Sequence, residues 1–167
     1  MAGELSRPAP VAVPGPVAPP GPVAPPEVVA LAAGIRDAIV AHCVAEAPLE
    51  ACGLVMGDRP WRDGGRALRW IPVANRLASA SRYELDPDAL LRLTLAADAA
   101  GEAFWAIVHS HPASEARPSS TDERTAAYPA SIHLVVSLAD PAAPVIRGWA
   151  ITDGAAQELP LEVSASN

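Results

Sequence analysis

Residues 104–112 have the sequence Phe-Trp-Ala-Ile-Val-His-Ser-His-Pro, an apolar run that ends in two histidines. A continuous apolar run of this length predicts a β-strand. Because side chains alternate along a strand, His109 and His111 point to the same side of it. The stretch therefore predicts a strand that presents two imidazoles side by side at its end.

A carboxylate follows this strand at a short distance. Asp122 comes eleven residues after His111, in a segment typical of a helix start. Two imidazoles and one carboxylate are a common catalytic zinc ligand set, because three protein ligands leave a fourth position for water. Pro112 and Pro118 stiffen the connecting loop, which limits the entropy lost when the ligands converge. We therefore interpret His109, His111 and Asp122 as metal ligands of a hydrolytic enzyme.

Each of these residues also has an ordinary structural interpretation. A His-x-His pattern arises often by chance, as two strand histidines without a ligand. Ser119 and Asp122 have the spacing of a capping box, although a cap and a metal ligand are compatible. His42 and His133 have no partner visible in the sequence, and we interpret them as structural; a position near the metal is the alternative for either.

Hydrolysis of an amide also requires a proton carrier and an oxyanion donor. Glu50 lies directly before a short apolar run and is the candidate that takes a proton from water and passes it to the leaving amine. Glu46 is its competitor, and a solvated charge at a helix end is the ordinary alternative for either. The Ser119 hydroxyl is the candidate donor to the oxyanion.

The remaining pattern mixes helices with strands. Apolar residues spaced along one helical face predict a helix over 27–46, which Pro48 ends. Asp86-Pro87 and Gly101 delimit a second helix, and a short third one starts at Ser120. Further strands are predicted over residues 52–56, 67–73, 82–85, 132–137, 145–151 and 157–163. This order predicts an α/β or α+β domain with a mixed or largely antiparallel sheet.

Composition narrows the organisation and the partners. Residues 1–26 contain Gly-Pro-Val-Ala-Pro-Pro twice and predict a disordered proline-rich tail, before one domain over 27–167. The net charge of -7 argues against nucleic-acid binding, which requires a basic surface. Charged residues interrupt the longest apolar stretch, residues 28–44, so we expect no membrane span. Two cysteines, Cys43 and Cys52, lie in apolar runs and indicate reduced thiols in a cytoplasmic protein.

Glu50, the His109-Ser-His111-Pro segment and Ser119-x-x-Asp122 agree in type, order and spacing with one known motif. They resemble the JAMM motif of the MPN+ zinc metalloproteases, and the resemblance extends over roughly residues 27–163. It implies a cytidine-deaminase-like α/β fold, in which a curved mixed sheet is flanked by helices. It also implies one zinc ion on His109, His111 and Asp122, with Glu50 as general acid/base and Ser119 as oxyanion stabiliser.

Within this family the chain looks like the compact bacterial branch. Members commonly hydrolyse bonds that follow the C-terminal Gly-Gly of ubiquitin-like proteins. Further segments resemble the branch that releases cysteine from a ubiquitin-like sulfur-carrier protein in cysteine biosynthesis: residues 50–53, 75, 83–86, 114–116 and 118–122. Pro112 and the proline-rich tail depart from that branch. The resemblance implies a ubiquitin-like small carrier protein as substrate partner, no nucleic acid or membrane partner, and a possible homodimer.

Two other classes of function are weighed against this one. A non-catalytic MPN-type binding scaffold keeps the fold and loses ligands, whereas this chain retains every motif position. A Ser-His-Asp hydrolase would use Ser110 or Ser119, but the chain has no Gly-x-Ser-x-Gly elbow. The zinc hydrolase is therefore the preferred hypothesis.

Overall fold

A mixed β-sheet forms the centre of the protein, for which the computed structural model describes residues 24–165. Its six strands have the order β3-β2-β4-β5-β6-β7. β4 and β5 run parallel, whereas the other neighbouring strands are antiparallel. The strands are β2 (Cys52–Gly57), β3 (Ala67–Val73), β4 (Ala103–His111), β5 (Ile132–Ser137), β6 (Val145–Thr152) and β7 (Ala155–Leu159). This arrangement confirms the expected mixed α/β fold.

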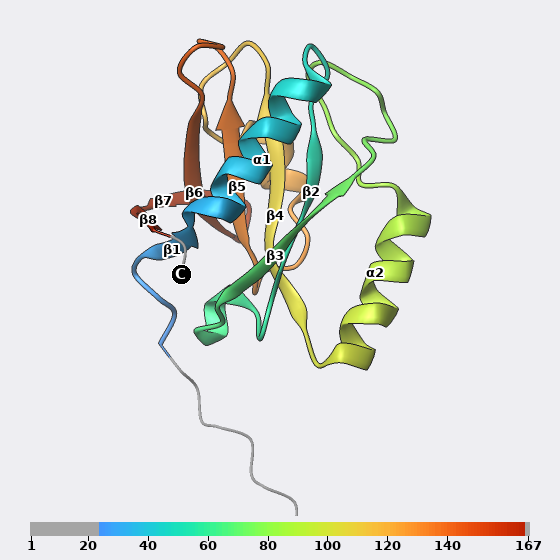
Figure 1. Ribbon diagram of the computed structural model, residues 1–167, viewed down its shortest axis with the longest axis vertical. Helices are drawn as coiled ribbons and strands as arrows, with labels where there is room; N and C mark the ends of the chain where they lie inside the picture. The colour runs from blue at the N-terminus through green and yellow to red at the C-terminus, as the bar shows by residue number, and fades with distance from the viewer. Residues whose placement is uncertain (1–23, 166–167) are drawn as a thin grey trace, which may run out of the picture.

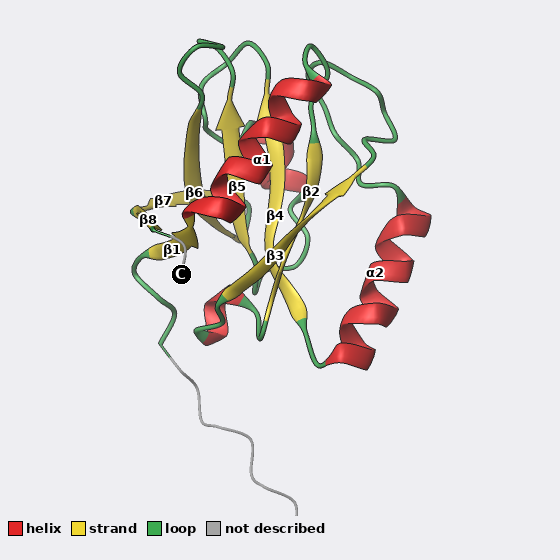
Figure 2. Ribbon diagram, viewed as in Figure 1, coloured by secondary structure: helices red, strands yellow, loops and turns green. Residues whose placement is uncertain are grey.

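Helices cover both faces of the sheet (Figures 1 and 2). α1 (Ala33–Glu46) packs on one face, over a core that includes Val55, Val108 and Leu134. α2 (Pro87–Ala100) covers the other face near β2 and β4, and its Ala97 packs with a second cluster around Ile107. The short helices are η1 (Trp61–Asp63), a 3-10 turn between β2 and β3, and α3 (Ser120–Thr125).

The predicted bounds of α2 and α3 are confirmed, and their caps explain them. The Asp86 carboxylate accepts a hydrogen bond of 2.8 Å from the Ala89 N–H, which satisfies a free donor of the first turn of α2. Gly101 ends this helix at φ 67°, a left-handed conformation that favours glycine. Ser119 caps α3 in a reciprocal capping box with Asp122.

Three predicted elements were wrong in their bounds or type. The helix expected over 27–46 begins with a strand, β1 (Val29–Ala32), that pairs in parallel with β8 (Leu161–Ser164). The strand expected over 157–163 is divided at Pro160 into β7 and β8, because proline has no N–H to donate to a ladder. Residues 82–85 form a loop that makes an isolated bridge between Asn75 and Leu85, not a strand.

Other predictions concern the termini and the thiols. The predicted tail, residues 1–26, lies outside the described residues except for its last three. Cys43 and Cys52 are free and buried, as expected. Between residues 24 and 165, no helix has both the length and the apolar character required to cross a membrane.

Candidate metal centre

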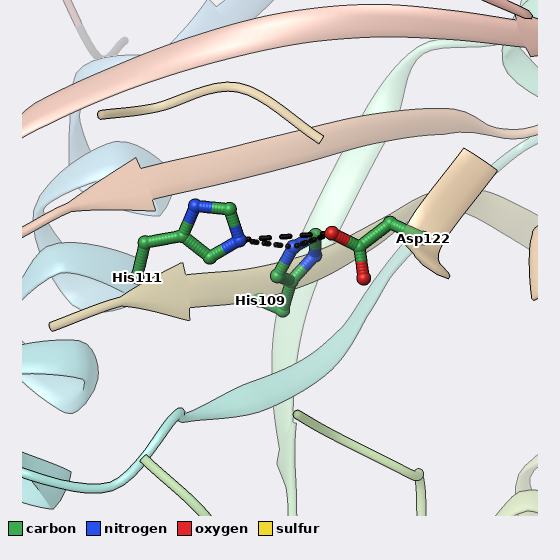
Figure 3. Close-up of side chains that lie close together, drawn as sticks. All are labelled: His109, His111 and Asp122. Atoms are coloured by element: carbon green, nitrogen blue, oxygen red, sulfur yellow. Dashed lines mark hydrogen bonds and ion pairs between the residues drawn. The ribbon is translucent and has the colours of Figure 1, made fainter. Parts of the chain in front are cut away.

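The two histidines lie at the end of β4, the strand from which the fold was predicted. Their rings point to the same side of the sheet, and Asp122 approaches them from the first turn of α3 (Figure 3). His109 is 0% exposed and His111 is 6% exposed. The structure thus brings together the three residues that the sequence singled out as ligands.

The three ligand atoms form a small, nearly equilateral triangle. His109 Nε2 lies 3.2 Å from His111 Nε2. Asp122 Oδ2 lies 3.5 Å from His109 Nε2 and 3.7 Å from His111 Nε2. Ligand atoms about 2.0–2.1 Å from a tetrahedral zinc ion are separated by roughly 3.3–3.4 Å, the edge of the tetrahedron. The residues present therefore fit a zinc ion with one open position.

Neighbouring groups orient two of the three ligands. His111 Nδ1 lies 2.9 Å from the Glu115 carbonyl oxygen, so it carries the ring proton and leaves the Nε2 lone pair toward the site. Asp122 Oδ2 accepts hydrogen bonds from the Ser119 N–H at 2.7 Å and from the Ser119 hydroxyl at 2.6 Å. Both ligands are thus held by hydrogen bonds before any ion binds.

His109 is oriented by ring stacking. Its ring centroid lies 4.4 Å from that of Tyr83, with 16° between the planes. The buried Nδ1 of His109 has no hydrogen-bond partner among residues 24–165, unlike the Nδ1 of His111. Aromatic packing therefore fixes the plane of the His109 ring, whereas the hydrogen bond of His111 fixes both the ring and its tautomer.

Electrostatics favour the cation-binding form of His109 and Asp122, whereas in the metal-free site they favour a proton on His111. Burial lowers the pKa of His109, so this imidazole is neutral at physiological pH. Burial alone would raise the pKa of Asp122, but its close contacts with both histidines and the hydrogen bond from Ser119 outweigh it and lower that pKa strongly. Burial also disfavours charge on His111, yet its contacts with Asp122 and Glu115 raise its pKa overall. An ionised carboxylate between imidazoles is a donor set suited to a divalent cation.

Glu50 lies beside these ligands, and backbone contacts to β4 place it there. Ala51 N–H donates to Ser110 Oγ at 2.8 Å, and Ser110 N–H donates to the Ala51 carbonyl at 2.9 Å. Glu50 is 5% exposed, and this burial raises its pKa to about 7. The charge of His111 opposes that shift and the charge of Asp122 adds to it, which shows that Glu50 shares their environment. Glu46, its competitor, ends α1 and is exposed.

The two serines have structural contacts. Ser110 is fully buried, and its hydroxyl accepts the Ala51 N–H, so it is not available as a nucleophile. The Ser119 hydroxyl donates its proton to Asp122 Oδ2 and accepts from the Asp122 N–H at 3.2 Å. Neither serine has a hydrogen bond to a histidine among the described residues, which removes the basis for a Ser-His-Asp hydrolase.

The sequence did not reveal the contacts of three supporting residues. Tyr83 stacks on His109, and Asn75 Nδ2 donates to the Glu50 carbonyl at 3.0 Å. His133 lines a cavity together with Ser119 and Asp122, although we had interpreted it as merely structural. His42 packs against Trp70, with 5.9 Å between ring centroids. Residues 75 and 83–86 belong to the segments that resemble the cysteine-releasing branch, but their contacts depend on the folded loop that bridges Asn75 to Leu85. His133 reaches the site through the parallel pairing of β5 with β4, and no local pattern signals it.

Comparison with known proteins agrees with this geometry. Residues 32–152 match the family model Prok-JAB, prokaryotic homologs of the JAB domain. The chain therefore belongs to the Prok-JAB family, which confirms the expected compact bacterial relative of the JAMM enzymes.

The matches to individual relatives cover most of the chain. It is 37% identical over 136 residues to the CysO-cysteine peptidase of Mycobacterium tuberculosis, covering 81% of this chain and 91% of that protein. It is 36% identical over 112 residues to the desampylase of Haloferax volcanii, covering 64% and 78%. The solution structure of a Desulfitobacterium hafniense protein matches with a TM-score of 0.72 and 31% identity, covering 83% and 94%. These relatives support the predicted enzyme class, a hydrolase.

Proposed function

We propose that this chain is a zinc-dependent hydrolase that cleaves an amide bond at the C-terminus of a ubiquitin-like or sulfur-carrier protein. The observation that carries the proposal is the triangle of His109, His111 and Asp122, with edges of 3.2–3.7 Å, beside a buried Glu50. The named relatives, a CysO-cysteine peptidase and a desampylase, support this substrate class.

In this proposal His109, His111 and Asp122 hold one zinc ion per chain. The ion, when bound, polarises the scissile carbonyl and acidifies water. His111 keeps its Nδ1 proton on the Glu115 carbonyl, so its Nε2 lone pair stays directed at the ion. Tyr83 keeps the His109 ring in place by stacking.

Glu50 moves the proton. With a pKa of about 7, its carboxyl group is present in both forms at neutral pH, so it takes a proton from water and returns it to the leaving nitrogen. Ser119 is assigned to the oxyanion. Its hydroxyl donates to Asp122 in the structure, so this role requires the hydroxyl to turn toward the carbonyl oxygen.

Finer parts of the proposal follow from the same site. The similarity to the CysO-cysteine peptidase supports cysteine as the group released, and hence a role in cysteine biosynthesis. The free, buried thiols Cys43 and Cys52 support a cytoplasmic location. We assign residues 27–167 to the hydrolase domain and propose that a homodimer is compatible with its function.

The test combines metal content with cleavage. The purified full chain is analysed by elemental mass spectrometry and then incubated with a sulfur-carrier protein whose C-terminal glycine is amide-linked to cysteine. We expect near-stoichiometric zinc and release of cysteine. The double variant His109→Ala/His111→Ala should lose both, whereas Glu50→Gln should keep zinc and lose cleavage.

A non-catalytic MPN-type scaffold is the alternative function. It predicts a folded protein that binds the carrier but takes up no zinc, even when zinc is offered. That outcome, or full activity of Glu50→Gln, would contradict the hydrolase proposal.

A further inference from the structure

A cavity of about 500 Å³ lies beside the metal centre. Ser119 and Asp122, of the metal centre, are among its lining residues, and so are Leu77, Leu85 and Leu90. Its volume falls within the range of about 300–1,000 Å³ that is typical of ligand pockets. The cavity is therefore large enough for a few residues of a substrate.

His133 faces this cavity from β5. Neighbouring side chains on β5, Ile132 and Leu134, point into the core beneath α1, so His133 points to the other face of the sheet. It is in register with Ile107 on β4, two residues before His109, and therefore shares a face with the metal ligands. Parallel pairing thus brings a third histidine to the same side of the sheet.

The ring of His133 has no protein partner. The residue is 2% exposed, and its Nδ1 is buried without a hydrogen bond within the described part of the chain. Buried polar atoms in native proteins are almost always paired with protein or ordered water, so an unpaired ring in a cavity wall can pair with a polar group that enters the cavity. Its position in the cavity makes a bound substrate the natural source of that group.

Charge restricts what the ring can bind. Burial lowers the pKa of His133 to about 4. At physiological pH the imidazole is therefore neutral, with one donor and one acceptor. A neutral ring can exchange hydrogen bonds with an uncharged peptide group. It carries no positive charge that would attract a terminal carboxylate.

The position of the cavity identifies the part of the substrate. A separate hollow of about 270 Å³ is lined by Glu50, Glu46 and His42. Because Glu50 is proposed to protonate the leaving nitrogen, we assign the leaving group to that hollow. The acyl segment carries the carbonyl oxygen that Ser119 is proposed to stabilise, so we assign it to the cavity that Ser119 and His133 line.

We propose that the 500 Å³ cavity binds the residues preceding the scissile bond and that His133 hydrogen-bonds an uncharged peptide group of this acyl segment. The proposal rests on the proposed hydrolase function. The leucine-lined wall adds a preference for an apolar side chain in the segment, because burying such a side chain is favourable. His133 is thus a substrate-binding residue that contributes to specificity.

The test uses the zinc-loaded full chain and the carrier–cysteine conjugate described above. His133→Leu removes the hydrogen bond and puts an apolar side chain in place of the imidazole, whereas His133→Asn keeps a donor and an acceptor. We expect His133→Leu to raise KM by about 3- to 10-fold with little change in kcat, since a net hydrogen bond has roughly that effect. His133→Asn should stay within about threefold of the wild type. Ile132→Val, on the opposite face of the same strand, is the matched control and should leave KM unchanged.

A second measurement does not depend on catalysis or on metal. Binding of the released carrier to the metal-free protein, followed by titration calorimetry, should weaken by the same factor in His133→Leu. If His133→Leu does not fold, the cavity is tested by changing the carrier instead of the enzyme. An apolar residue near the carrier C-terminus is replaced by Asp, and we expect this carrier conjugate to have a raised KM. Two results would overturn the assignment of the cavity while leaving the proposed function intact, provided that the wild type cleaves the conjugate. The first is a His133→Leu variant with unchanged KM and unchanged carrier affinity. The second is an unchanged KM for the carrier that carries Asp. A wild type that holds zinc but cleaves no conjugate would overturn the proposed function and the inference together.

Discussion

Replacement of Glu50 by glutamine is expected to stabilise the metal-free protein, and the stabilisation should grow with pH. Glu50 is buried, and its pKa in the folded state is about 7 instead of 4.5. Between these values the unfolded chain carries an ionised carboxylate while the folded protein keeps it neutral. The folded wild type therefore loses stability as the pH rises from about 4.5 to 7, and the loss is complete above 7. Glutamine is neutral at every pH and avoids this loss.

The size of the effect follows from the shift. A difference of about 2.5 pKa units corresponds to about 3 kcal/mol at pH 8 and to less than about 1 kcal/mol at pH 5. At about 2–4 °C per kcal/mol, Glu50→Gln should melt roughly 6–12 °C above the wild type at pH 8. The same variant should lose about 10²- to 10⁴-fold in hydrolysis rate, because it removes the proton carrier.

The assay is urea unfolding of both proteins in a chelator, at pH 5 and at pH 8. Glu46→Gln is the matched control for the substitution itself, because the Glu46 side chain is exposed. An equal gap at the two pH values, or a Glu50→Gln protein less stable than the wild type at pH 8, would show that burial of Glu50 does not control its ionisation.

Three further substitutions test the supports of the site. Ser110→Ala leaves the Ala51 N–H without its acceptor and should cost about 1–3 kcal/mol in the free energy of urea unfolding, with slower hydrolysis. Tyr83→Leu removes the ring stacked on His109 and should weaken zinc binding by about 10-fold, measured by competition with a chelator; unchanged affinity would contradict a positioning role. Asp86→Ala removes the cap of α2 and should cost about 1 kcal/mol by thermal unfolding, while zinc content stays at the wild-type level.

The comparison of sequence and structure shows where local patterns suffice. Alternation along β4 correctly predicted that His109 and His111 share a face, because that property depends on backbone geometry alone. The bounds of α2 followed from Asp86 and Gly101, whose effects act within one helical turn. Glu50 was selected by its resemblance to a motif, and its burial beside the ligands agrees with that choice.

Local patterns failed where distant segments pair. Val28 and Leu31 match a helical face in the sequence, yet Val29–Ala32 form a strand because β8 pairs with them from the other end of the domain. His133 has no neighbour in the sequence that signals a site. Its position beside His109 depends on the parallel register of β5 with β4.

Residue order alone was thus enough to predict the mixed fold, the ligand types and their family, because periodicity, caps and motif spacing are written along the chain. Only the tertiary structure formed the triangle with edges of 3.2–3.7 Å, buried Glu50 so that its pKa is raised, and formed the cavity lined by His133. Distances between side chains and the removal of water depend on segments far apart in sequence, and these meet only when the sheet has formed.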